Sequence, residues 1–199
     1  MKKIIFKKDT QKGYNKHNIF IEKGVYIKKG TIVYSGNVVL GKSVLDNCEL
    51  LPNNHIEDAL IFSGSIIGPF ARIRPNSTIC EDCKIGNFVE IKNSFIDKNT
   101  KIAHLTYVGD AEIGCNCNLG CGTVFCNYDG EKKHRCKIGN NVFIGSNSNL
   151  IAPLIIGDDC IIACGTVVTN DMSNGTFAIG RAKQENRKNK KVGQNKCMQ

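Results

Sequence analysis

The sequence predicts an all-β fold, a parallel β-helix built from six-residue repeats, on three observations. A branched apolar residue recurs every six positions, glycine often follows it, and a small residue often stands four positions after it. Two steps of the series are five residues long instead of six. The apolar positions are Ile67, Ile73, Ile79, Ile85, Ile91, Ile96, Ile102, Val108, Ile113, Leu119, Ile138, Ile144, Leu150, Ile156, Ile162 and Val168.

Each position of the hexad has a physical reason in such a coil. Of the sixteen apolar positions, eight are followed by glycine, which permits the backbone to turn. Twelve have Ala, Ser, Cys, Val or Thr at the fourth following position, where a tight corner needs a small side chain. An amphipathic helix is excluded, because a period of six with many glycines and β-branched residues contradicts helix propensity. Spacing alone gives neither the handedness of the coil nor the number of subunits.

The regularity of the repeat divides the chain into three predicted parts. These parts are a lead-in or cap over residues 1–24, the β-helix over residues 25–172, and a C-terminal arm with a basic tail over residues 173–199. The early part, through Ile32, Leu40 and Ile56, repeats more loosely. After Val168 the pattern ends, and we expect either a short helix over 181–190 or an irregular tail.

The composition narrows the expected partners and the compartment. The net charge is +9, and residues 181–199 hold seven Lys and Arg against one Glu. This concentration of charge in the tail argues against a nucleic-acid groove across the fold, and the simplest interpretation of the tail is a solvated chain end. The N-terminal apolar run has three residues and no stretch approaches a membrane span. We therefore predict a cytoplasmic protein with no nucleic-acid or membrane partner.

The eleven cysteines are expected to be reduced thiols in that compartment. Cys80 and Cys83 have C-x-x-C spacing, but a structural zinc site would also require a second such cysteine pair or histidines at matching spacing. Cys83, Cys117 and Cys160 all stand at the small-residue position of the hexad. We predict that these three pack in the coil rather than bind metal.

The repeat breaks at FCNYDGEKKHRC, residues 125–136, and resumes afterwards. Bulky polar residues gather before and within this break. Three hexads make one triangular coil, so Arg74 and Lys92, eighteen residues apart, should stack on the same face of successive coils. Two stacked cations suit a phosphate, and the alternative is a pair of solvated cations. His104 is the only histidine within the regular repeat and a candidate general base, the alternative being an ordinary surface residue.

The segments IGPFARIRP, IGNFVEIK, AHLTYVGDAEIG, NLGCGTVFCNYDG and IGSNSNLIAP closely resemble one bacterial family. This family is the acetyltransferase half of the bifunctional N-acetylglucosamine-1-phosphate uridyltransferase/glucosamine-1-phosphate acetyltransferase. The resemblance runs without a gap from about residue 50 to about residue 187. It implies a left-handed parallel β-helix, assembled as a homotrimer with active sites between subunits. It also implies acetyl-CoA-dependent conversion of glucosamine-1-phosphate to N-acetylglucosamine-1-phosphate, a step toward UDP-GlcNAc and peptidoglycan.

The resemblance also implies roles for individual residues. His104 matches the family's general base, which takes a proton from the sugar amine. Residues matching those that hold the amino-sugar phosphate are Arg74, Lys92, Tyr107 and Asn118. Residues matching those that contact acetyl-CoA are Cys121, Asn127, Tyr128, Ser146, Cys164 and Arg181. Lys133 is expected to reach a neighbouring subunit's site and Glu90 to orient His104. No metal is required, because the thioester carries its own leaving group.

Three departures from the family leave alternatives open. Nothing in residues 1–60 resembles the Gly-rich nucleotide loop of the uridyltransferase domain, so we do not expect this chain to make UDP-sugars. The early coils look shortened, and Cys121 and Cys164 stand where the family usually has alanine. The acceptor could therefore be another amino-sugar phosphate or a nucleotide-linked amino sugar. A trimeric β-helix that only binds a ligand or a protein is the non-enzymatic alternative.

Overall fold

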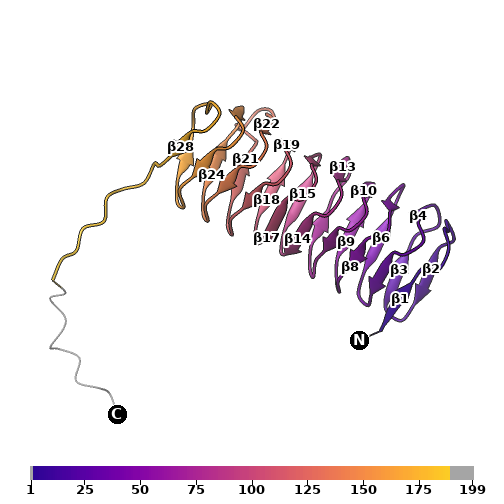
Figure 1. Cartoon of the computed structure of the whole chain (residues 1–199). Helices are drawn as coiled ribbons and strands as arrows, with labels where there is room; N and C mark the ends of the chain where they lie inside the picture. The colour runs from indigo at the N-terminus through magenta and orange to yellow at the C-terminus, as the bar shows by residue number, and fades with distance from the viewer. Residues whose placement is uncertain (1, 189–199) are drawn as a thin grey trace, which may run out of the picture.

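The computed structural model describes residues 2–188, which form a solenoid of three-sided coils (Figure 1). Three sheets run along its length, and each coil contributes one strand to each sheet. Sheet A contains β1 (Lys3–Ile5), β5 (Ile32–Tyr34), β8 (Glu49–Leu50), β11 (Ile66–Ile67), β14 (Lys84–Asn87), β17 (Lys101–His104), β20 (Asn118–Leu119), β23 (Phe143–Ile144), β26 (Ile161–Ile162) and β28 (Phe177–Ala178). Sheet B contains β4 (Tyr26–Ile27), β7 (Val44–Leu45), β10 (Ala59–Ile61), β13 (Ser77–Ile79), β16 (Phe95–Ile96), β19 (Ala111–Ile113), β22 (Cys136–Ile138) and β25 (Leu154–Ile156). Sheet C contains β2 (Tyr14–Lys16), β3 (Ile19–Ile21), β6 (Val38–Leu40), β9 (His55–Glu57), β12 (Arg72–Ile73), β15 (Glu90–Lys92), β18 (Tyr107–Gly109), β21 (Val124–Cys126), β24 (Asn149–Ile151) and β27 (Val167–Val168).

Strand pairing follows the repeat. Ile73 pairs with Ile91 and Ile91 pairs with Val108, so equivalent positions of successive hexads lie over one another. Pairing is parallel throughout the described strands except at the N-terminal end, where β1 pairs antiparallel with β5 and β2 with β3. The predicted fold class, an all-β left-handed parallel β-helix, is confirmed.

The core is the stack of apolar hexad positions. All sixteen positions of the predicted series are buried, most of them completely. Phe125, at the start of the break, is also buried and pairs with Leu150 of the next coil, so the core continues past the interruption. Cys83, Cys117 and Cys160 lie in the same core, which confirms their predicted packing role. Burial raises the pKa of the Cys83 thiol to about 12, so it stays protonated.

One corner of the coil carries bulky residues in an unusual backbone conformation. Between sheets A and C, Phe70, Phe88 and Leu105 have φ angles of 59°, 56° and 45°, a region that large L-residues rarely adopt. The rings of Phe70 and Phe88 stack with centroids 5.6 Å apart. All three side chains are at least half exposed. They form an apolar corner ridge that ends next to His104.

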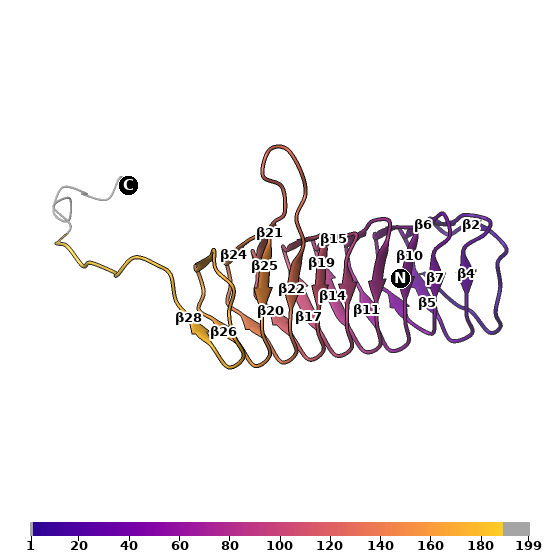
Figure 2. The same ribbon diagram turned by 90° about the horizontal axis from the view of Figure 1, so that it is seen from above.

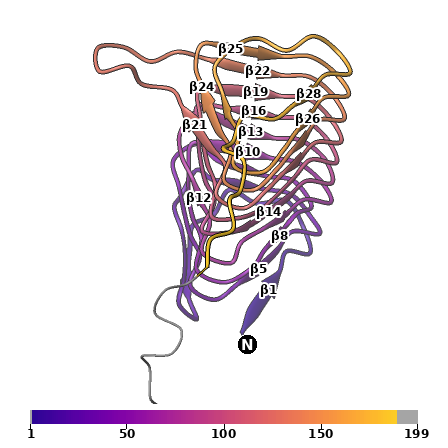
Figure 3. The same ribbon diagram turned by 90° about the vertical axis from the view of Figure 1, so that its left-hand side faces the viewer.

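The break in the repeat is an excursion loop, residues 127–135, between β21 and β22. Figure 2 shows the loop standing out from the body of the solenoid, and Figure 3 shows the same projection with the coils seen nearly end-on. At the C-terminus, residues 181–188 contain no helix, so of the two expectations the irregular tail is the one observed there. The rest of the predicted 181–190 helix lies outside the described residues. Residues 2–188 hold no helix long and apolar enough to cross a membrane.

Candidate active site

The predicted site residues lie on two adjacent faces of the solenoid. Arg74, Lys92 and Tyr107 belong to sheet C or its end, and His104 and Asn118 belong to sheet A. The chain turns between these faces at the corner that contains Leu105. The structure therefore forms two half-sites within one chain, one cationic and one built around the histidine.

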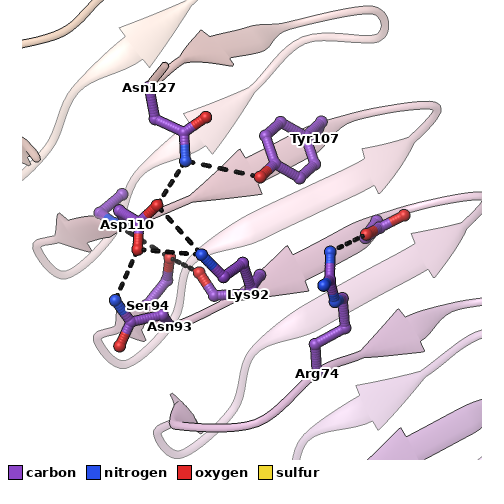
Figure 4. Close-up of polar contacts among 9 residues, drawn as sticks. Arg74, Lys92, Asn93, Ser94, Tyr107, Asp110 and Asn127 are labelled. Carbon is purple, nitrogen blue, oxygen red and sulfur yellow. Dashed lines mark hydrogen bonds and ion pairs between the residues drawn. The ribbon is translucent and has the colours of Figure 1, made fainter. Parts of the chain in front are cut away.

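The first half-site consists of three basic side chains, which we call the cationic cluster: Arg74, Lys92 and Lys133. The pairing of Ile73 with Ile91 places Arg74 beside Lys92 on successive coils, as predicted. Each has an acidic partner within the chain. Arg74 Nη1 lies 2.9 Å from Glu90 Oε1, and Lys92 Nζ lies 3.3 Å from Asp110 Oδ2 (Figure 4).

Lys133 comes to this cluster from the excursion loop of the same chain. The side chain of Lys92 lowers the pKa of Lys133. The larger cause is hydrogen bonding between the two side chains, and the smaller is repulsion between their charges. The pKa of Lys92 is raised by the same hydrogen bond and by the charge of Asp110. Two neighbouring amines repel each other when both are protonated, and a phosphate bound beside them would relieve that repulsion.

Asp110 is the buried acidic group of this half-site, with 5% of its surface exposed. Its carboxylate accepts hydrogen bonds from Lys92, Asn93 and Asn127 (Figure 4). Burial by itself would raise the pKa of Asp110. The hydrogen bonds from the two amides and the charge of Lys92 outweigh burial and hold that pKa below its usual value.

The excursion loop begins at Asn127, whose Nδ2 also donates to Tyr107 Oη at 3.5 Å. Beyond it Tyr128 is exposed and forms an antiparallel bridge with Lys133. The tip is closed by a hydrogen bond of 2.6 Å between Asp129 Oδ2 and His134 Nε2. The break in the repeat thus brings a further asparagine, tyrosine and lysine to the end of sheet C, beside Asn93, Tyr107 and Lys92 of the coil.

His104 ends β17 on the other half-site, and its side chain is exposed. Its Nδ1 lies 2.9 Å from Asn87 Oδ1, which sits one coil earlier in register. Because the amide oxygen can only accept, this bond places the ring proton on Nδ1 and the lone pair on Nε2. Glu90, expected to orient His104, bonds to Arg74 within the chain, and Asn87 is the residue that contacts the His104 ring there.

The predicted acetyl-CoA residues of sheet A form one row along the solenoid. The pairings of Ile102 with Leu119, Leu119 with Ile144, and Ile144 with Ile162 set this row. The residue two positions after each of these paired residues belongs to the row. These residues are, in order, His104, Cys121, Ser146 and Cys164. Arg181 joins the end of the row, since its Nη1 donates to the Cys164 carbonyl at 2.8 Å. With strands about 4.8 Å apart, His104 and Cys164 are separated by roughly 14 Å.

A groove of about 390 Å³ opens on sheet A beside His104. Gly86 lies in its floor, where a Cβ atom would overlap the carbonyl of Ala103 on the next coil. The residues around it are Leu51, Gly68, Pro69, Lys84, Gly86, Asn87, Lys101, Ala103, His104 and Asn118. The groove thus combines the histidine, the predicted substrate residue Asn118 and two lysines on neighbouring strands.

Three residues of the site were not assigned from the sequence: Asp110, Asn93 and Asn87. Asn87 carried a signal, because the five-residue step after Ile91 makes this coil seventeen residues long and stacks His104 on Asn87. Asp110 and Asn93 carried no separate signal. Both stand at corner positions with positive φ, where this chain mostly has Asp, Asn or Gly for backbone reasons.

Comparison with known proteins agrees with the predicted fold and resemblance. Residues 135–170 match the model of the bacterial transferase hexapeptide (six repeats), and residues 58–128 match that of the GMPPB C-terminal domain. The bifunctional protein GlmU of Caldicellulosiruptor saccharolyticus is 56% identical over 142 residues, which cover 71% of this chain and 30% of that protein. Over that span this chain is closely similar to part of GlmU. The predicted resemblance is thereby confirmed.

GlmU of Clostridium tetani extends the match, with 44% identity over 188 residues that cover 86% of this chain and 41% of that protein. The chain therefore spans less than half of the length of these GlmU relatives. Among solved structures, UDP-N-acetylglucosamine acyltransferase from Campylobacter jejuni has a TM-score of 0.52 over 77% of this chain and 71% of that one. At 15% identity, that likeness concerns the fold alone.

Proposed function

We propose that this chain transfers the acetyl group of acetyl-CoA to the amine of glucosamine-1-phosphate in the cytoplasm, giving N-acetylglucosamine-1-phosphate for UDP-GlcNAc and cell-wall synthesis. The observation that carries the proposal is the position of His104. It stands at the head of the row that contains Cys121, Ser146 and Cys164, one corner away from the cationic cluster. N-acetylation of a sugar phosphate needs a base beside the acyl donor and an anion site within reach of that base, which a neighbouring copy's cationic cluster would supply.

The reaction is a direct acyl transfer. His104 Nε2 takes a proton from the sugar amine as the nitrogen attacks the thioester carbonyl, while Asn87 keeps the imidazole in the correct tautomer. The carbonyl oxygen gains negative charge in the transition state and needs hydrogen-bond donors. The C–S bond then breaks and CoA leaves as the thiolate, so the chain supplies a base, donors and positioning.

The acceptor phosphate belongs in the cationic cluster. Lys92 and Lys133 are close enough for each to shift the pKa of the other, and Arg74 lies one coil away from Lys92 on the same face. A phosphate dianion accepts hydrogen bonds from all three groups and neutralises their repulsion. Tyr107 lies at the edge of this cluster, where its hydroxyl can contact the sugar.

We further propose that the working protein is a homotrimer. The two half-sites lie on different faces of one chain, so a second copy must bring its sheet C toward this chain's sheet A to complete a pocket. The exposed corner ridge of Phe70, Phe88 and Leu105 lies at the edge between those faces and supplies apolar surface for such contact. Light scattering of the purified protein tests this, and a monomer would overturn the shared site.

A second acceptor class is favoured by the groove beside His104. Lys84 and Lys101 stand on neighbouring strands in its wall and provide cationic sites beyond those needed for one phosphate. A nucleotide-linked amino sugar would use them.

The test is to mix the purified protein with acetyl-CoA and each acceptor and to detect the N-acetylated product by mass spectrometry. His104→Ala serves as the matched control. Thiol-reactive dyes would be confounded by the eleven cysteines. Product from glucosamine-1-phosphate but not from nucleotide-linked sugars supports the first proposal, and the reverse supports the second. No product from any amino sugar, with acetyl-CoA still bound, would overturn acetyl transfer to an amino sugar.

A further inference from the structure

Asp110 lies at the corner between β18 and β19, directly below the base of the excursion loop. Its backbone is part of the coil ladder. The Asp110 amide donates to the Lys92 carbonyl at 3.0 Å, and the Asp110 carbonyl accepts from the Cys136 amide at 3.2 Å. Cys136 is the first residue after the loop, so the main chain of Asp110 holds the loop's exit.

The side chain of Asp110 holds the loop's entrance. Asn127 is the first residue of the loop, and its Nδ2 donates to the Asp110 carboxylate. The His134 amide, near the exit, bonds back to the Asn127 carbonyl at 2.8 Å. Both ends of the excursion loop are therefore tied to one residue, by its carbonyl on one side and its carboxylate on the other.

The same carboxylate also fixes Lys92. Lys92 Nζ lies 3.4 and 3.3 Å from the two Asp110 oxygens, and Asn93 Nδ2 lies 2.5 Å from Oδ1. Figure 4 shows Lys92, Asn93 and Asn127 converging on this one group. With 7% of its side chain exposed, Asp110 is shielded from water, so these bonds are strong and geometrically restrictive.

Other corner acids do not have this environment. Asp58 stands at the equivalent corner three coils earlier, with a similar φ of 44°, and is not buried. Its carboxylate accepts from the backbone amide of Lys42. A corner of this geometry therefore needs only a residue that tolerates positive φ. That requirement does not explain why Asp110 is buried or why its carboxylate has three side-chain partners.

We propose that Asp110 is a positioning residue that sets the acceptor-binding Lys92 and the excursion loop with a single carboxylate. The proposal rests on the proposed function for the identity of the acceptor. The loop carries Asn127, Tyr128 and Lys133, so Asp110 links the loop's groups to the cationic cluster. Loss of its charge releases Lys92 and the loop entrance together, although neither His104 nor the row behind it is touched.

The test compares Asp110→Asn with Asp58→Asn, which makes the same chemical change at a matched corner. We expect Asp110→Asn to raise KM for glucosamine-1-phosphate about tenfold, with kcat changed less than about threefold, since charged hydrogen bonds that position the acceptor are lost. We expect trypsin to cleave the loop of Asp110→Asn after Lys132 or Lys133 about tenfold faster than that of the wild type. Asp58→Asn should match the wild type in both measurements.

Each arm has a result that overturns the proposal. Equal loop cleavage in Asp110→Asn and the wild type shows that Asp110 does not hold the loop. An unchanged acceptor KM in an active, folded Asp110→Asn variant shows that it does not position Lys92. If Asp110→Asn does not fold, Asn127→Ala removes the loop-side bond alone and must still accelerate cleavage. A wild-type protein without activity refutes the proposed function, while the proteolysis arm, which needs no substrate, still decides the anchoring of the loop.

Discussion

Replacing Lys133 by methionine should weaken binding of the sugar phosphate and remove most of its dependence on pH. In the free protein, contact with Lys92 lowers the pKa of Lys133. An anion bound between the two amines favours the protonated form of Lys133, so binding and protonation are linked. Binding is therefore strongest below the pKa that Lys133 has in the free protein, and it weakens as the pH rises through that value.

The size of the change in Kd with pH follows from the uptake of one proton by Lys133 on binding. Above the free-protein pKa of Lys133, the Kd of the wild type should rise about tenfold per pH unit until the pKa of the complex is reached. At neutral pH, Lys133→Met should cost about tenfold in Kd, the range of a charge-assisted hydrogen bond at a solvated site.

Titration calorimetry with N-acetylglucosamine-1-phosphate measures this cleanly, because the amide nitrogen of that ligand does not titrate. The range from about pH 7.5 to 10 lies above the phosphate pKa and below that of an ordinary lysine. Repeating the titration in two buffers of different ionisation enthalpy gives the proton uptake directly. Lys132→Met, which removes an equal charge from the same loop, is the control. Equal Kd values for the two variants, with no proton uptake by the wild type, would refute the reasoning.

Three further outcomes test the histidine and the core. His104→Ala should lower kcat at least ~100-fold, the scale of a lost general base, and an unchanged rate would remove His104 from the mechanism. Asn87→Ala should lower kcat about tenfold, with a shifted pH–rate profile, because the Nδ1 tautomer is no longer fixed; a profile identical to the wild type would contradict this. Ile91→Ala, in the completely buried stack, should lower the free energy of unfolding by about 3 kcal/mol in urea titrations, and Ile91→Val by about 1 kcal/mol. A loss below that of Ile91→Val would mean that the core collapses around the cavity.

The solenoid could be predicted in detail because its core obeys one spacing rule. Each apolar hexad position has the same environment, so a period of six identifies every buried residue of the series, and the three-hexad coil predicts the stacking of Arg74 on Lys92. The same arithmetic, applied with the five-residue step, stacks Asn87 under His104. Within the chain, the spacing therefore already contained a partner for His104 besides Glu90, which bonds to Arg74.

The role of Asp110 could not be predicted in this way. Most corners of the coil have Asp, Asn or Gly because of their backbone conformation, so Asp58, Asp82 and Asp110 look alike in the sequence. What distinguishes Asp110 is the loop above it, which buries its carboxylate and brings Asn127 to it. The path of an excursion outside the repeat is set by tertiary contacts, and periodicity carries no information about them.

The placement of the site on two faces leads to a decisive test of assembly. His104 projects from sheet A and Lys92 from sheet C, and the corner ridge separates them within one chain. We therefore expect a substrate whose amine meets His104 while its phosphate meets Lys92 to contact His104 of one copy and Lys92 of another. Each site of a trimer would therefore be divided between two neighbouring chains.

Mixed trimers of His104→Ala and Lys92→Met chains distinguish divided sites from sites within one chain. Each variant alone has every site damaged and should be nearly inactive. When the two are unfolded together and refolded in equal amounts, a site is intact only where a Lys92→Met chain supplies His104 and a His104→Ala chain supplies Lys92. Random assembly makes this combination in about a quarter of sites, so about a quarter of wild-type activity should return. If His104 and Lys92 of the same chain act together, every site retains one defect and mixing restores no activity.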